Sequence, residues 1–390
     1  MVSYWQAFLL FLTSATGVSV AGIRISDIAI SLFILSIPFC YKKCLIINSE
    51  ILLYLLLLST VILCTIKLNF ANNYSTLSSS SSINSIIIPA LIVISATVCL
   101  IFKKNHVIQI LSSYASITCI FSIIILCADQ ANLLSMIVFP DDGIDRFTGL
   151  SKNPNQFALI LLPVPFFCGI AVFEGVKTKS RAAIEIAGIL FINLFVVGKS
   201  LFVAWFVAMI FLYVIGWSFS GKRYLNLLRL SKRLIVILAL CLFASPLMLR
   251  LYMGDLPGSQ EDQGETRLVL WTNGLAAWLD SPVLGHGPGH YSGLTAPHEN
   301  MEAHNTLVDW LSAYGVFGGI SLAIFAGWIF FISVKSQMWI VSAMILALYW
   351  QAMFHFYGRQ PMFWLILAFG YLLSKKIVRG ENKLSITIPY

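Results

Sequence analysis

The chain has 390 residues, of which 58% are hydrophobic and only 11% are charged, with a formal net charge of +8. Soluble domains carry roughly 25% charged residues, so this composition excludes an ordinary soluble protein and predicts a surface that mostly faces lipid. The basic excess does not indicate nucleic-acid binding, because Lys and Arg occur in short clusters between apolar runs. We therefore predict an all-α polytopic membrane protein.

Twelve apolar runs approach the length of about 20 residues that a membrane helix needs. In chain order they lie near residues 4–22, 26–41, 45–66, 84–102, 107–127, 155–173, 183–198, 200–217, 234–251, 306–333, 338–354 and 360–374. They divide the chain into three parts. Nine spans form an N-terminal transmembrane bundle (1–251), a long polar segment follows (252–305), and three spans with a tail complete the chain (306–390).

The distribution of Lys and Arg predicts the orientation, because these residues concentrate in cytoplasmic loops. With both termini in the cytoplasm, 17 of the 25 Lys and Arg residues fall on the inner side, whereas 13 of the 17 Asp and Glu residues fall on the outer side. The opposite orientation would reverse the bias. We therefore expect a multi-pass protein of a bacterial inner membrane, with its polar chemistry on the periplasmic face.

Lys and Arg residues at the outer membrane boundary are the first candidate site residues. Such residues normally concentrate on the cytoplasmic side, so their presence outside indicates a functional role. They are Arg24, Arg146, Lys199, Arg267 and Arg359. Singly, each has a simpler interpretation: Lys199 could be a snorkelling cation at a helix turn, and Arg267 could pair with a surface carboxylate. Together they suit a diphosphate group, which guanidinium groups bind in a bidentate fashion.

Histidine provides the second part of the candidate site. His304 is the last polar residue before a long span, and Asn305 is the predicted N-cap of that helix. A neutral imidazole there can accept a proton from an attacking hydroxyl near neutral pH, or it can orient that hydroxyl. Residues expected to support the acceptor or the surrounding loops are Asn305, His286, His290 and Asn155. His286 and His290 lie in a Gly-rich segment where backbone can approach a substrate closely.

Metal binding is an alternative for the same region. The possible zinc ligands are His286, His290, His298, His304, Glu299 and Glu302. Their spacing matches no zinc motif, and a Gly-Pro-Gly sequence separates the first two histidines. The acidic run Asp141, Asp142 and Asp145 lacks the ligand pattern of a calcium loop. We expect neither a metal nor a cofactor.

These motifs, taken in order, resemble the O-antigen ligase and polymerase superfamily. The resembling pieces are Arg146-x-x-Gly149 with Asn153-Pro154-Asn155, Arg267-x-x-x-Trp271, Pro282-Val283-Leu284-Gly285-His286-Gly287, and His304-Asn305 with Gly315-x-x-Gly318. The resemblance implies a GT-C-like, inverting, metal-independent membrane glycosyltransferase that uses an undecaprenyl-diphosphate glycan. It further implies that Arg267 binds the diphosphate and that His304 is essential. Lys199 falls where the family usually has Arg, and lysine lacks the bidentate fork.

Three functions remain open at this point. The first is ligation of the glycan to lipid A–core oligosaccharide. The second is polymerisation of lipid-linked repeats, because the residues that choose the acceptor cannot be recognised in the sequence. The third is transport of the same lipid, although transporters usually place ionisable groups near the bilayer midplane. The expected partners are the lipid-linked donor, the lipid A–core acceptor and membrane lipid, without nucleic acid.

Overall fold

The computed structural model describes most of the chain. The described ranges are residues 2–20, 23–37, 49–70, 78–131, 147–196, 199–218, 232–240, 263–289, 291–293 and 301–378. Two of the predicted site residues, Arg146 and His290, lie outside them, as do the possible metal ligands His298 and Glu299 and the acidic run that begins at Asp141.

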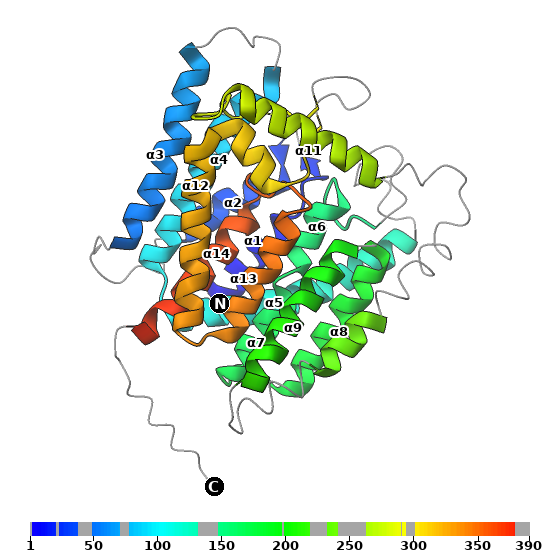
Figure 1. Cartoon of the computed structure of the whole chain (residues 1–390). Coiled ribbons are helices and arrows are strands. Elements are labelled where there is room, and N and C mark those ends of the chain that lie inside the picture. The colour runs from blue at the N-terminus through cyan, green and yellow to red at the C-terminus, as the bar shows by residue number, and fades with distance from the viewer. Residues whose placement is uncertain are drawn as a thin grey trace.

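The described residues are mainly helical, which confirms the all-α prediction (Figure 1). The helices are α1 (Val2–Leu12), α2 (Ile25–Ser36), α3 (Ser49–Phe70), α4 (Ser78–Ile101), α5 (Lys104–Gln130), α6 (Pro154–Leu161), α7 (Val164–Phe173), α8 (Lys179–Val196), α9 (Lys199–Ser218), α11 (Gln263–Asp280), α12 (Thr306–Lys335), α13 (Trp339–Ala352) and α14 (Pro361–Val378). Residues 232–240 are also helical. Between α1 and α2, strands β1 (Ser19–Val20) and β2 (Ile23–Arg24) form an antiparallel hairpin.

The prediction of one continuous helix over residues 4–22 is wrong, because α1 ends at Leu12. The chain then turns and pairs with a distant loop: the Gly17 N–H donates to Leu150 O (3.1 Å) and Ser151 Oγ donates to Ser14 O (2.7 Å). The predicted span 155–173 is likewise divided into α6 and α7 around Pro163, since proline removes a helical hydrogen bond and crowds the preceding turn.

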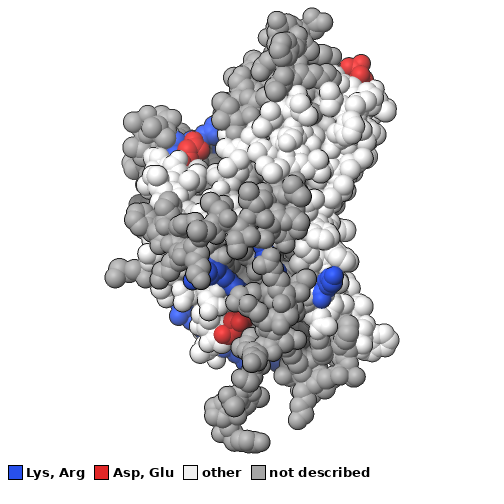
Figure 2. All heavy atoms as spheres, turned by 90° about the vertical axis from the view of Figure 1, so that its left-hand side faces the viewer, with Lys and Arg blue, Asp and Glu red and all other residues white. Residues whose placement is uncertain are grey.

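Among the residues that the structure describes, three segments are long and apolar enough to cross a membrane, namely α5, α6 with α7, and α12. The protein also carries exposed apolar stripes, such as Ile320, Ile324, Trp328 and Phe331 along α12. Figure 2 shows one side of the molecule on which broad uncharged areas separate a few charged patches. These features are those of a membrane protein. The total of twelve spans stays a prediction.

Helices near the C-terminus pack against helices from the first third of the chain. Helix α14 lies against α4, where Ser95 Oγ donates to Trp364 O (3.1 Å), and α12 lies against α3. The indole rings of Trp205, Trp310 and Trp364 are fully buried in the apolar core. The bundle has two ends. Helices α5 and α8 begin at one end, and helices α6, α9, α12 and α14 begin at the other (Figure 1).

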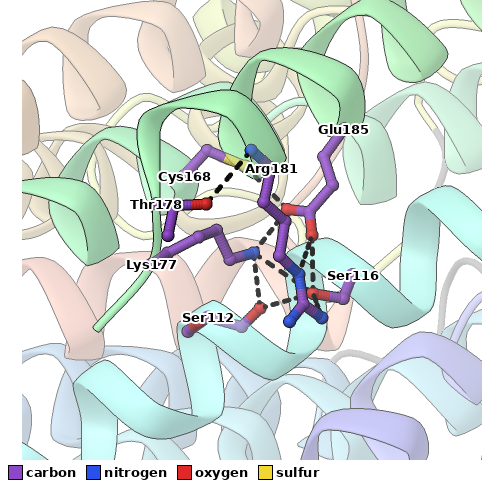
Figure 3. A network of polar contacts seen from close by, with 7 residues as sticks. All are labelled: Ser112, Ser116, Cys168, Lys177, Thr178, Arg181 and Glu185. Atoms are coloured by element: carbon purple, nitrogen blue, oxygen red, sulfur yellow. Dashed lines mark hydrogen bonds and ion pairs between the residues drawn. The ribbon is translucent and has the colours of Figure 1, made fainter. Parts of the chain in front are cut away.

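A buried ionic network occupies the end where α5 and α8 begin (Figure 3). Lys177 pairs with Glu185, and Glu185 also accepts hydrogen bonds from Ser116 Oγ (2.7 Å) and Arg181 Nε (3.2 Å). Lys177 Nζ further donates to Ser112 O (3.0 Å). Because the charges are paired and hydrogen-bonded, the network fixes how α5, α7 and α8 meet instead of leaving an uncompensated buried charge.

Candidate functional site

The predicted site residues that the structure describes gather at the bundle end opposite that network (Figure 1). All of them except His286, which follows α11, stand at or next to the start of a helix: Arg24 precedes α2, Asn155 is in the first turn of α6, Lys199 opens α9, Arg267 is near the start of α11, His304 and Asn305 precede α12, and Arg359 precedes α14. A helix N-terminus carries a partial positive charge and unpaired N–H groups. Each of these helix starts therefore adds a local partial positive charge beside a site residue.

Hydrogen bonds join these helix starts into one assembly. Thr306 Oγ1 donates to His355 O (2.6 Å) and accepts from the Tyr357 N–H (3.0 Å), which ties α12 to the loop before α14. Ser200 Oγ and His355 Nε2 lie 3.1 Å apart, which ties in α9 beside Lys199. Tyr357 Oη donates to Asn155 O (3.3 Å). Asn155 therefore contributes a backbone contact that supports this end.

His304 stands immediately before the N-cap of α12. The Asn305 carboxamide accepts from Leu307 N (3.0 Å) and Val308 N (3.2 Å), which confirms the predicted cap. His304 itself has φ = 52°, a left-handed conformation that is uncommon for a residue other than glycine. Burial lowers the pKa of the half-buried imidazole, and the nearby Arg267 guanidinium lowers it further. The ring is therefore neutral near pH 7 and able to accept a proton.

Helix α11 brings Arg267 to this position. The helix lies across the end of the bundle in Figure 1, and it approaches α12 closely at Gly274, where a Cβ would lie 2.6 Å from both Ser292 Oγ and Val308 Cγ1. Arg267 is seven residues earlier, two turns along the same helix face. Glycine at the contact thus allows Arg267 to come near His304, and burial lowers the pKa of its guanidinium as well.

The sequence predicted that the Gly-rich segment after α11 would approach a substrate closely. In the structure this segment approaches the backbone of α12. Helix α12 is interrupted at Gly315 (φ 63°, ψ −165°). Residues 282–287 fill the interruption: His286 N donates to Ser312 O (3.0 Å), Gly287 N to Ala313 O (2.8 Å), and Val316 N to Pro282 O (2.8 Å). His286 Nε2–H donates to Ala277 O (2.8 Å), so this side chain supports the loop.

The remaining cations differ in their surroundings. Lys199 and Arg24 are exposed, whereas Arg359 is half-buried and forms an ion pair with Glu302. Burial and the neighbouring Arg24 lower the pKa of Arg359 to about 10, so it remains charged at neutral pH. Sequence reasoning considered Glu302 only as a metal ligand and missed its pairing with Arg359, because 57 residues separate the two along the chain.

Comparison with known proteins adds the family. A family model described as O-antigen ligase matches residues 166–323, and this match confirms the resemblance predicted from the motifs. The matched segment contains Lys199, Arg267 and His304, whereas Arg24 and Arg359 lie outside it. No curated protein matches the chain. The match indicates activity of the O-antigen ligase or polymerase type.

Proposed function

We propose that this protein, whose residues 166–323 match the O-antigen ligase family model, transfers a glycan from undecaprenyl diphosphate to a hydroxyl of lipid A–core oligosaccharide. The observation that carries the proposal is the position of His304, held in a left-handed conformation before the N-cap of α12 with Arg267 nearby, at the end of the bundle where several helices begin. We place this end at the periplasmic face of the inner membrane, because the opposite orientation would put the more basic loops outside.

The proposed reaction needs a base and an anion site. The acceptor hydroxyl gives its proton to His304 while its oxygen attacks the anomeric carbon of the glycan. The bond from that carbon to the diphosphate oxygen breaks, and the diphosphate leaves with the bonding electrons. Attack opposite the leaving group inverts the anomeric configuration. The released proton stays on the imidazole until it exchanges with water.

The leaving diphosphate gains negative charge as the bond breaks, and fixed cations stabilise that charge. Arg267 can bind it with two parallel hydrogen bonds, while Lys199 supplies a point charge. The starts of α9 and α12 add their partial positive charges. Because these groups neutralise the leaving group, the proposed reaction is metal-independent and uses no cofactor. The energy for transfer is stored in the donor.

The test is transfer by the purified protein, with synthetic undecaprenyl-diphosphate glycan, lipid A–core acceptor and a chelator present. We expect glycan attached to the core, and we expect His304→Gln to lower kcat by roughly 10²–10⁴-fold. His106→Gln is the matched control, because His106 is a half-buried histidine at the other end of the bundle. Full activity of His304→Gln in a normally inserted protein would contradict the proposal.

The same assay separates the alternatives. Longer glycans that stay on the lipid carrier, without attachment to the core, would assign a polymerase, which uses the same donor site. Absence of transfer to any acceptor would favour the transporter hypothesis, and movement of the labelled lipid between leaflets of a proteoliposome would then be measured.

A further inference from the structure

The two residues before His304 are held from two sides. Glu302 forms an ion pair with Arg359 from the loop before α14, and the Glu302 and Arg359 side chains are 12% and 32% exposed. The Ala303 N–H donates to Asp309 Oδ1 (2.9 Å), and Asp309 is 3% exposed in the first turn of α12. Two shielded carboxylates from different positions therefore fix the short segment that leads into His304.

The backbone at His304 needs such support. A left-handed conformation at a residue with a side chain costs free energy and persists where the surroundings impose it. On the far side of His304, Asn305 caps α12 and Thr306 is bonded to the 355–357 loop. The loop before α14 therefore makes two contacts with this segment: it is hydrogen-bonded to Thr306, and its Arg359 forms the ion pair with Glu302.

The surroundings of Arg359 argue against direct binding of the donor. A diphosphate would have to compete with a carboxylate already paired with this guanidinium, in a place where water screens the pair weakly. Arg24 and Lys199 are exposed at the same end and face no such competition in the ion pairs of the described residues.

We propose that Glu302, Arg359 and Asp309 are positioning residues that hold His304 in its productive conformation, and that Arg359 acts through Glu302 and not as a ligand of the diphosphate. The inference rests on the proposed function, since it concerns the base of that reaction. It revises the expectation, based on sequence, that all five outer cations bind the donor.

The kinetic test compares Glu302→Gln, Arg359→Gln and the double variant. Because a small misplacement of a catalytic group can cost about 100-fold, we expect each single variant to lower kcat by roughly 10–100-fold. Donor KM should stay within about twofold, since no donor contact is lost. The double variant should be no slower than the slower single variant, because both changes break one pair.

Arg24→Gln is the matched control for a donor ligand. We expect it to raise donor KM by about tenfold with little change in kcat, and its effect should multiply with that of Glu302→Gln. Arg359→Gln would overturn the proposal if it behaved like this control, raising donor KM at unchanged kcat and multiplying with Glu302→Gln. Arg359→Lys, which keeps the charge opposite Glu302, should retain more activity than Arg359→Gln at equal membrane insertion.

A second readout does not depend on transfer. The imidazole of His304 can be titrated by NMR in labelled protein, with His304→Gln used to assign its signal. Loosening of the segment exposes the ring, so Glu302→Gln and Asp309→Ala, which removes the acceptor of the Ala303 N–H, should raise its pKa toward the ordinary value near 6.5, while Arg24→Gln should leave it unchanged. An unaltered titration in both carboxylate variants would overturn the positioning role. Absence of transfer by the unmodified protein would instead contradict the proposed function.

Discussion

The protonation state of the His304 imidazole, and with it the proposed activity, depends on the surroundings of the ring. Its pKa lies below the ordinary value of 6.5 because the ring is buried and because Arg267 is near. The neutral, proton-accepting form is therefore present above the lowered pKa and is lost as the pH falls through it. The same lowering means that the folded state loses stability as the pH falls below about 6.5, where the unfolded chain is already protonated.

Removal of Arg267 should move this titration. We expect the acid limb of the pH profile of kcat/KM to lie below pH 6.5 in the unmodified protein and to shift upward in Arg267→Gln, measured on its residual activity. Lys199→Gln is the control, because Lys199 is not among the groups that shift the His304 pKa. An acid limb at the same pH in all three proteins would contradict the assignment of His304 as the base.

Lys199 provides a second prediction at the level of the residue. It opens α9 as an exposed point charge next to Ser200, which contacts His355. A charge-assisted contact contributes about 1.5–3 kcal/mol, so Lys199→Ala should raise donor KM by roughly 10–100-fold. Lys199→Arg should restore binding, since arginine adds a bidentate fork. Lys152→Ala, which removes another exposed lysine at this end, should leave donor KM near that of the unmodified protein.

The interruption of α12 is the element on which the site depends. A Cβ at Gly315 would lie 2.3 Å from Val283 O, and one at Gly285 would lie 2.4 Å from the Ala313 carbonyl, while both residues have positive φ. A side chain at either position would separate the 282–287 segment from α12 and leave carbonyl groups unpaired at membrane depth. Two glycines thus hold α11, and Arg267 with it, in register with His304.

This element gives a matched pair of glycine variants. Gly315→Ala should destabilise the protein by several kcal/mol, because it combines backbone overlap with a strained φ. Gly327→Ala lies in the same helix with no neighbouring atom within 4 Å, so it should be neutral or stabilise by about 0.5–1 kcal/mol. Thermal unfolding in detergent measures both. Equal melting temperatures of the two variants would show that the interruption is not essential.

At the scale of the whole molecule, the two ends differ in charge chemistry. One end carries the paired network of Lys177, Arg181 and Glu185, and the other carries the cations of the candidate site. The predicted orientation puts the first end in the cytoplasm. An impermeant maleimide added to intact cells should therefore label Lys152→Cys but not Lys179→Cys, measured above the background of the native cysteines. Labelling of Lys179→Cys alone would reverse the orientation and exclude a periplasmic site.

Much of the fold could be predicted, because apolar length is read directly from sequence and lipid imposes it. The 4–22 helix was wrong because apolar composition does not reveal that Gly17 pairs with Leu150 across the bundle. The site was predicted in part: Asn305 has a cap signature, and basic residues at outer boundaries are unusual. The Glu302–Arg359 pair and the packing of residues 282–287 against α12 depend on tertiary contacts. Local sequence patterns do not predict such contacts.

The contact between α4 and α14 has a consequence for biosynthesis. Ser95 and its acceptor Trp364 are 269 residues apart, and ribosomes add about 5–20 residues per second. For roughly 15–50 seconds the new α4 therefore stands in the membrane before its last neighbour exists. Thr306 is made only 49 residues before His355, so it waits roughly 2–10 seconds for that loop. We therefore expect the candidate site to be complete only after α14 has entered the bilayer, and a chain truncated before Pro361 to leave α4 exposed to lipid or to quality-control proteases.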